Sequence, residues 1–446
     1  MIRAGSRKAF VRPPTLPHRW VAGKRWESIS QRPGSDRLRF PGAVNSPFTN
    51  ILAFVRPNEK DAMPTFRVLD QEGMVMQKNK EVDVAQDEAI RWYKDMLTVS
   101  IMDIIMFDAQ RQGRLSFYMV SAGEEGIAVG SASALDPADV IFAQYRETGI
   151  YKYRGFTLDD FMSQLFSNRN DPGRGRNMPV HYGSRQLNMH TISSPLATQI
   201  PQAAGAAYAL KLQHMQNPQS PPRCVACYFG EGAASEGDFH AALNIAATRS
   251  CPILFLCRNN GFAISTPSLE QYKGDGIASR GVGYGIDTIR VDGNDILAVR
   301  EATQRARELC LEDGGRPVLI EAMSYRVSHH STSDDSFAYR AKVEVEDWKR
   351  RDNPITRLRK FMESKGWWNE QQERETRSAL RKEVLAAFNR AEAEKKPPLR
   401  AMFEDVYSEL TEESQEQMKQ LGDIIDRYPR EYDVEEFEDG RKGLNP

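Results

Sequence analysis

The sequence has little cysteine for its length and no apolar stretch that could cross a membrane. Five cysteines among 446 residues form an odd set, which argues against a disulfide framework and fits a reducing compartment. Cys224 and Cys227 have CxxC spacing, but no second pair completes a zinc site, so we expect buried core thiols. The densest apolar runs, 99–107 and 252–257, are far shorter than the roughly 18–20 residues that a bilayer requires. We therefore expect no membrane insertion.

Excess charge of either sign is also absent. The 60 basic and 61 acidic residues give a formal net charge of −1, whereas a nucleic-acid-binding protein normally has a basic excess. We therefore expect no nucleic-acid partner. Hydrophobic residues make up 40 % of the chain and charged residues 27 %, which is the composition of a globular protein with a substantial core.

The beginning of the chain differs in composition from the rest. Arginine and lysine recur throughout residues 1–40, where Glu27 and Asp36 are the only acidic residues. An arginine-rich, serine-containing, acid-poor segment is typical of a mitochondrial transit peptide. We interpret residues 1–45 as a transit peptide with a flexible leader, which would direct the protein to the mitochondrial matrix. A disordered basic tail of another purpose is the alternative.

The rest of the chain alternates helical patterns with short apolar runs. After an extended segment over 46–86, with a possible hairpin at 66–73, apolar residues at helical spacing predict an amphipathic helix over 87–111. Apolar runs separated by helices predict βαβ units and a mostly parallel sheet; they lie at 140–143, 225–229, 253–257, 288–291 and 318–322. We therefore expect an α/β domain over 87–340, with helices flanking the sheet. Residues 341–446 read as a charged, helical C-terminal region.

A glycine-rich turn connects two of the expected strands. The strand at 225–229 runs into a turn over 230–237 that contains Glu231, and the strand at 253–257 is followed by Arg258, Asn259 and Asn260. Adjacent parallel strands would bring Glu231 and Asn260 to the same carboxyl edge, where open α/β sheets bind ligands. Oxygen ligands of this kind suit Mg²⁺, and small residues let backbone N–H groups approach an anion. The alternative is that the glycines only form tight turns.

The glycines around Glu231 and the thirty-residue step from Gly230 to Asn260 resemble the thiamine-diphosphate motif, which begins Gly-Asp-Gly and ends Asn-Asn. Wider stretches resemble the α subunits of branched-chain 2-oxo acid (2-oxoisovalerate) dehydrogenases, the E1 components of their complexes; these stretches are 119–134, 144–148, 178–202, 227–238, 257–267 and 325–335. The similarity runs from about residue 66 to 406. It implies the thiamine-diphosphate-binding fold and oxidative decarboxylation of branched-chain 2-oxo acids.

The resemblance also implies roles for individual residues. Mg²⁺ would be held by Glu231, by Asn260 and by the backbone carbonyl of Phe262, where the family usually has tyrosine. Thiamine diphosphate would contact Tyr145, Arg146, Ser194, Leu196, Gly232, Ala233, Arg258 and His330. A K⁺ ion would be bound by Ser193, Pro195, Thr198 and Gln199. For Arg146 and Arg258 there is also a physical reason apart from the resemblance, because guanidinium groups neutralise a diphosphate with charge-assisted hydrogen bonds.

Without the resemblance, two of these groups have simpler interpretations. Tyr145 and Arg146 would be an ordinary surface pair. The hydroxyl-rich segment 193–199 would supply capping residues for a small-residue helix over 203–209.

A loop with two histidines and two aspartates follows the strand at 318–322. A transition-metal site is disfavoured because adjacent histidines on an extended chain point apart, whereas an imidazole beside a diphosphate suits proton transfer. The resemblance implies a catalytic role for His330. It also implies that a dedicated kinase phosphorylates Ser331, with a phosphatase reversing this, while the family's second phosphorylated serine falls on Ala341 here.

The chain offers only one sheet domain. The resemblance implies that a separate β subunit supplies the glutamate that activates the cofactor, that the assembly is an α₂β₂ heterotetramer, and that the acyl group passes to the lipoyl group of an E2 core. The main alternative is a pyruvate dehydrogenase α subunit. A dinucleotide turn formed by glycines 281, 283 and 285 is disfavoured because a short strand follows it and it opens no convincing helix. A binding module without catalysis is disfavoured because the expected metal, cofactor and catalytic residues are all present.

Overall fold

The computed structural model describes residues 49–54, 62–77 and 82–444. The chain divides into two units, residues 1–58 and 59–446, and all the helices and strands below belong to the second. The leader expected over 1–45 lies outside the described residues. Of the helices in these described ranges, none is long and apolar enough to cross a lipid bilayer.

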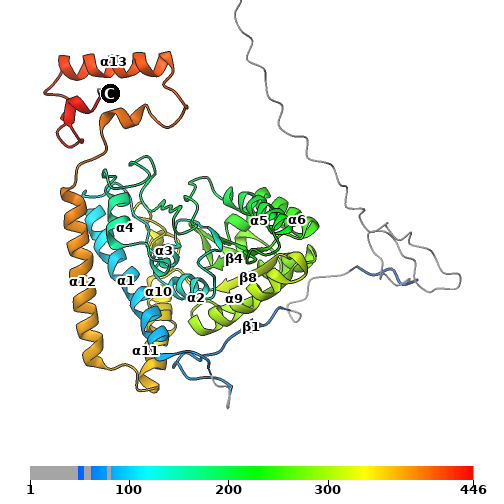
Figure 1. The fold of residues 1–446 in the computed structure, drawn as a ribbon. Coiled ribbons are helices and arrows are strands. Elements are labelled where there is room, and N and C mark those ends of the chain that lie inside the picture. Colours follow the sequence, from blue (N-terminus) through cyan, green and yellow to red (C-terminus); the bar gives the residue numbers. More distant parts are fainter. Residues whose placement is uncertain (1–48, 55–61, 78–81, 445–446) are drawn as a thin grey trace, which may run out of the picture. The chain divides into compact units, whose positions relative to one another are not determined.

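A six-stranded parallel sheet forms the centre of the second unit (Figure 1). Its strand order is β1-β7-β8-β4-β3-β2, and the strands are β1 (Thr65–Phe66), β2 (Val140–Phe142), β3 (Val225–Gly230), β4 (Ile253–Asn259), β7 (Asp287–Asp292) and β8 (Val318–Met323). Five of them coincide with the apolar runs, so the predicted parallel α/β sheet is confirmed. The sixth, β1, pairs with β7 at the edge and leads into a turn closed by an antiparallel bridge between Leu69 and Val75.

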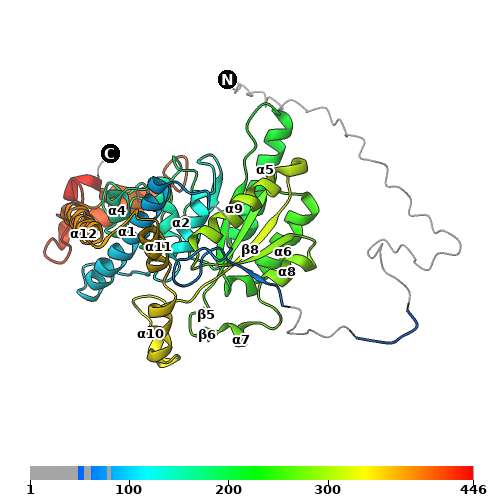
Figure 2. The same ribbon diagram turned by 90° about the horizontal axis from the view of Figure 1, so that it is seen from below.

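Helices cover both faces of the sheet (Figure 2). One face packs on α5 (Gln199–Gln216), α6 (Gly237–Arg249) and α8 (Ala278–Gly283), whereas the other packs on α1 (Gln86–Arg111), α2 (Glu125–Ser133), α3 (Thr148–Arg154) and α9 (Ile296–Leu311). Alternate residues of β3 divide between these two cores: Tyr228 belongs to one and Phe229 to the other. Burial on both faces explains why the strands read as continuous apolar runs.

Helix α1 agrees with its predicted bounds to within one residue but not with a simple amphipathic pattern. Trp92, Tyr93 and even Asp103 are buried, because α2, α11 (Pro354–Ser364) and α12 (Glu370–Ala393) pack around it on several sides. Ile104, expected on the buried face, is 58 % exposed. The helix therefore forms the centre of a helical layer rather than the cover of one face.

The C-terminal region is helical, as predicted. It comprises α10 (Lys342–Arg351), α11, α12 and α13 (Glu412–Arg427). Short elements elsewhere in the second unit are α4 (Leu158–Leu165), α7 (Ser268–Gln271) and an antiparallel ribbon of β5 (Phe262–Ala263) and β6 (Thr266–Pro267). Asn353 caps α11 by accepting from Thr356 N, and Pro354 occupies its first turn. Beyond Pro398, a small apolar cluster of Leu399, Ile425 and Leu444 supports α13.

Candidate active site

Strands β3 and β4 are neighbours and parallel, and they end at the same edge of the sheet. The backbone N–H of Glu231 donates to the carbonyl oxygen of Arg258 at 3.1 Å, and the N–H of Asn260 donates to Glu231 Oε2 at 3.4 Å. Both side chains are buried. Burial raises the pKa of Glu231 to about 7. The sheet thus brings together the carboxylate and the amide that the sequence predicted to share this edge.

Two buried arginines lie beside this pair. Arg258 belongs to β4 and forms ion pairs with Glu124 and Glu147, while Arg146 follows β2 and places its Nε 3.6 Å from Glu124 Oε1. Burial opposes the charge of Arg258, but the two carboxylates outweigh it and raise its pKa. Two buried guanidinium groups, each paired with a carboxylate, therefore line the same cavity as Glu231.

These side chains line a cavity of about 220 Å³ at the carboxyl edge of the sheet. Ten residues predicted for the metal and the cofactor line it: Tyr145, Arg146, Leu196, Glu231, Gly232, Ala233, Arg258, Asn260, Phe262 and His330. Ser194 does not; its hydroxyl lies 2.9 Å from His181 Nε2. Gln144 Oε1 accepts from the backbone N–H of Gly230 at 2.9 Å, which holds the glycine-rich turn against the loop after β2.

The two histidines of the loop after β8 face in different directions, as expected. His329 Nδ1 accepts from the N–H of Ser336 at 2.9 Å, whereas His330 Nε2 lies 3.3 Å from the hydroxyl of Tyr145 in the cavity. Burial, together with the positive charges of Arg146 and Arg326, lowers the pKa of His330 to about 3. In the described residues, no cluster of histidine, cysteine and acidic side chains could hold a metal. The loop therefore offers a neutral imidazole to the cavity.

The loop before α5 does not cap that helix in the ordinary way. The helix begins at Gln199, and the side chain of Thr198, its first flanking residue, makes no capping hydrogen bond. Thr198 Oγ1 lies instead 3.3 Å from Ser193 Oγ and 3.1 Å from the carbonyl oxygen of Pro195. The amide of Gln199 donates to the carbonyl oxygen of Tyr228 on β3. The hydroxyl oxygens of Thr198 and Ser193 and the carbonyl oxygen of Pro195 thus lie close together. Because the side chain of Thr198 does not cap α5, the capping interpretation is wrong.

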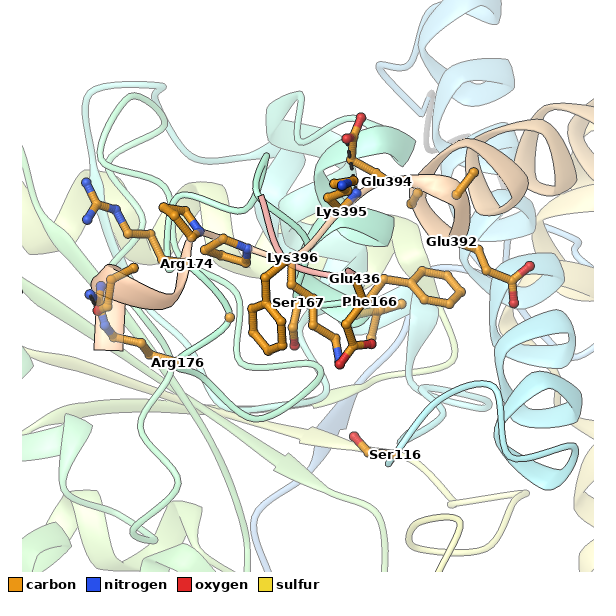
Figure 3. Close-up of a pocket in the computed structure, with 18 of the residues that line it drawn as sticks. Ser116, Phe166, Ser167, Arg174, Arg176, Glu392, Glu394, Lys395, Lys396 and Glu436 are labelled. Atoms are coloured by element: carbon orange, nitrogen blue, oxygen red, sulfur yellow. Dashed lines mark hydrogen bonds and ion pairs between the residues drawn. The ribbon is translucent and has the colours of Figure 1, made fainter. Parts of the chain in front are cut away.

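A second, larger cavity of about 850 Å³ lies beside the segment that follows α12 (Figure 3). Each of its arginines forms an ion pair: Arg114 with Glu392, and both Arg174 and Arg176 with Asp405. Lys396 pairs with Glu436. None of the residues predicted for the metal or the cofactor lines this cavity, so it is not the candidate site.

The dinucleotide turn suggested by the sequence is not supported. Glycines 281 and 283 lie at the end of α8 and glycine 285 lies just before β7, whereas a dinucleotide turn would follow a strand and open a helix. Cys224 and Cys227 are free and fully buried, as expected for core thiols.

Comparison with known proteins identifies the family. Residues 93–400 match the family model described as dehydrogenase E1 component. The chain belongs to this family. It is 49 % identical over 422 residues to the mitochondrial 2-oxoisovalerate dehydrogenase subunit alpha of Bos taurus, covering 95 % of this chain and 90 % of the relative. The namesake proteins of Dictyostelium discoideum and Homo sapiens are 52 % and 49 % identical, covering 86 % and 90 % of this chain and 85 % and 89 % of those relatives.

Membership of the dehydrogenase E1 family establishes the thiamine-diphosphate-binding fold, as expected. The cavity has the unpaired groups that such a cofactor and its metal would satisfy. Within the described part of the chain, Glu231 Oε1 and Arg146 Nη1 are buried without a hydrogen-bond partner, and so are Nε and Nη1 of Arg326. A buried acceptor without a donor and buried cations without an acceptor cost free energy unless a ligand pairs with them. The residues present therefore fit a metal-bound diphosphate.

Two residues of the site were not predicted from the sequence. Glu124 and Glu147 are 1 % and 0 % exposed and hold the arginines, yet no motif in the sequence identified them. A signal was available for Glu124, because it lies in a stretch of small and apolar residues, from 119 to 135, where a buried carboxylate needs a partner. Glu147 follows Arg146 directly and looks like half of a local surface pair.

Proposed function

We propose that this chain is the α subunit of the E1 component of a branched-chain 2-oxo acid dehydrogenase complex. The dehydrogenase E1 family and the names of the relatives support this enzyme class and favour the branched-chain branch over the pyruvate dehydrogenase alternative. The observation that carries the proposal is the cavity, where a buried unpaired carboxylate oxygen and unpaired guanidinium groups face the edge of β3 and β4. The family match, and not the cavity alone, disfavours a module without catalysis.

The chain's own residues would bind and orient the cofactor and its metal. Glu231, Asn260 and the carbonyl oxygen of Phe262 would hold Mg²⁺, which prefers oxygen ligands and keeps some phosphate and water. The diphosphate would lie against Gly232 and Ala233 and pair with Tyr145, Arg146 and Arg258, while Ser194 and Leu196 would face the rest of the cofactor. Bound thiamine diphosphate supplies the electron sink for loss of CO₂ from a 2-oxo acid.

His330 would act as the catalytic residue of the chain. Its imidazole is neutral and lies within reach of Tyr145 in the cavity. A diphosphate bound against Arg146 would offset the positive charge that lowers the pKa of this imidazole, and His330 would then transfer protons near the reacting carbon and during acyl transfer to the lipoyl group of E2.

A K⁺ ion would be bound by Ser193, Pro195, Thr198 and Gln199. The convergence of two hydroxyl oxygens and one carbonyl oxygen supports this, since hard cations prefer such ligands. The ion would fix the loop that carries Ser194 and Leu196 next to the cofactor.

Partners and location complete the proposal. As a subunit α of an E1 enzyme, the chain requires a β subunit, which we place with it in an α₂β₂ heterotetramer that acts on a lipoyl-bearing E2 core. Ser331 would be the target of a regulatory kinase and phosphatase. The relatives are named mitochondrial, and we assign the chain to the mitochondrial matrix with residues 1–45 as its transit peptide.

Co-expression with the cognate β subunit tests this function. We expect the purified complex to decarboxylate 3-methyl-2-oxobutanoate in preference to pyruvate, with activity that requires thiamine diphosphate and Mg²⁺. The α chain alone should be inactive. A complex that prefers pyruvate, or an α chain that turns over unaided, would contradict the proposal.

A further inference from the structure

One buried carboxylate contacts three residues of the proposed metal and diphosphate site. Glu124 lies immediately before α2 and is 1 % exposed. Its Oε1 accepts from Asn260 Nδ2 at 2.8 Å and lies 3.6 Å from Arg146 Nε, and its Oε2 pairs with Arg258 Nη1. The side chain therefore connects the residue after β4, the end of β4 itself and the loop after β2.

The contact with Asn260 fixes which way its amide points. A carboxylate only accepts hydrogen bonds, so the amide nitrogen of Asn260 must face Glu124. The amide oxygen then accepts from the backbone N–H of Phe262 at 3.2 Å, and the backbone N–H of Asn260 itself donates to Glu231 Oε2 at 3.4 Å. A magnesium ligand has to be this oxygen and not the nitrogen. Glu124 thus selects the orientation that can bind the metal.

The charge of Glu124 acts in the same direction. The side chain lies between two buried guanidinium groups, with Oε1 3.6 Å from Arg146 Nε and Oε2 paired with Arg258 Nη1. It therefore separates two like charges that would otherwise repel each other. It also contributes negative charge beside Glu231, which favours a divalent cation.

The neighbouring carboxylate makes a natural comparison. Glu125 is 2 % exposed, but its Oε2 accepts from the backbone N–H of Gly123, and the structure shows no hydrogen bond or ion pair from it to Asn260 or to either arginine. The two residues therefore share burial and position at the start of α2. They differ in their contact with the site, and burial raises the pKa of Glu125 to about 8.

We infer that Glu124 is a positioning residue for the metal and diphosphate site: it orients the amide of Asn260 and holds Arg146 and Arg258 for the ligand. This inference rests on the proposed function. It adds a residue that does not itself touch the metal or the cofactor, and it explains why Glu124 is buried in contact with two arginines.

The experiment compares three variants in the purified complex with the β subunit. Glu124→Gln keeps the shape but donates as well as accepts, so the amide of Asn260 is no longer oriented and the charge is lost. Glu124→Asp keeps the charge, and Glu125→Gln is the matched control. Calorimetric titration with thiamine diphosphate at several Mg²⁺ concentrations gives the Mg²⁺ requirement, and circular dichroism and size-exclusion chromatography confirm fold and assembly.

We expect Glu124→Gln to raise the half-saturating Mg²⁺ concentration roughly 10- to 100-fold. Excess Mg²⁺ should restore much of the turnover, so the change appears in the apparent KM for Mg²⁺ more than in kcat. Glu124→Asp should fall between wild type and Glu124→Gln, and Glu125→Gln should match wild type.

Other outcomes would overturn the inference. Unchanged Mg²⁺ dependence in Glu124→Gln would remove its positioning role. Equal weakening in Glu125→Gln would show that burial of any carboxylate at this turn is enough, which makes the role merely structural. If the wild-type complex bound no thiamine diphosphate at any Mg²⁺ concentration, the proposed function itself would fail, and that result is distinct from a difference between variants.

Discussion

Arg146 Nη2 donates a hydrogen bond of 2.8 Å to the carbonyl oxygen of His330. The loop after β2 and the loop after β8 are therefore joined by one guanidinium group that is 2 % exposed. Nη1 of the same group has no partner among the described residues, and its Nε faces Glu124. Arg146 thus holds the histidine loop with one nitrogen and leaves another for an anion in the cavity.

Arg146→Lys should weaken binding of thiamine diphosphate while preserving the charge. A lysine ammonium cannot reach both the carbonyl oxygen of His330 and a diphosphate with fixed geometry. Loss of one charge-assisted hydrogen bond costs about 1.5–3 kcal/mol, which corresponds to roughly a 10- to 100-fold higher Kd in calorimetry of the α/β complex. Arg307→Lys is the control, because Arg307 pairs with Asp139, near the start of β2 and away from the carboxyl edge of the sheet. Equal effects of the two substitutions would contradict the prediction.

His330 should remain neutral well into the acid range. Burial and the charges of Arg146 and Arg326 lower its pKa to about 3, so an unfolded chain binds a proton here between about pH 6.5 and 3 that the folded chain does not. The contribution to stability is therefore complete above about pH 6.5 and is lost as the pH falls toward 3. His330→Asn should make the thermal midpoint of the cofactor-free complex less sensitive to acid.

Nuclear magnetic resonance of ¹³C-labelled histidine in the α chain checks the same point directly. The chain has seven histidines, and His330→Asn identifies the relevant signal. We expect that signal to show no titration between pH 7 and 5. A midpoint near pH 6.5 would mean that the imidazole is not held neutral by its surroundings.

Most of the sheet could be predicted from the sequence, because strands buried on both faces are continuous apolar runs. The order of the strands could not be predicted, since the pattern identifies a strand but not its neighbours. Strand β1 was not predicted, because two residues, Thr65 and Phe66, carry no recognisable period. The environment of α1 was also missed: Asp103 is buried because it accepts from Tyr118 Oη and Ser121 N, partners that the helical pattern does not reveal.

The residues of the site also fall into those that the sequence predicted and those that it did not. Glu231 and Asn260 follow from local motifs at the ends of adjacent strands, and the cavity brings them together. Glu124 and Glu147 do not follow from local motifs. Both pair with Arg258, and Glu124 also pairs with Arg146, and these contacts between distant parts of the sequence form only in the fold. A local pattern can propose a ligand, whereas the groups that orient it require the tertiary structure.

Ser331→Glu should abolish lipoyl-linked turnover. The hydroxyl of Ser331 accepts from Ser333 N at 3.2 Å, and the residue is 7 % exposed, so added negative charge has to displace the loop or meet Asp334. Asp334 Oδ2 accepts from the backbone N–H of His330, so repulsion there also disturbs the loop that carries His330. Turnover of the complex with lipoylated E2 measures the effect.

Matched variants separate this effect from a general loss of charge balance. Ser333 is exposed, and Ser333→Glu should retain most of the activity; Ser331→Ala should be active as well. Undiminished turnover in Ser331→Glu would refute the regulatory assignment.

Gly232→Ala should destabilise the glycine-rich turn for a steric reason that a second substitution can relieve. Gly232 has φ −63° and ψ −41°, which alanine adopts readily, but a Cβ there would lie 2.7 Å from the Cβ of Ala263 in β5. Overpacking of this kind costs about 1–3 kcal/mol, which should lower the thermal midpoint of the complex. Ala263→Gly removes the opposing atom, so the double variant should recover stability, while cofactor affinity stays reduced because the added methyl group occupies the lining of the cavity. Gly237→Ala is the control, since a Cβ added to Gly237 at the start of α6 would meet no atom within 4 Å. Wild-type stability of Gly232→Ala, or a double variant no more stable than the single one, would show that the turn and the ribbon do not pack as closely as the structure indicates.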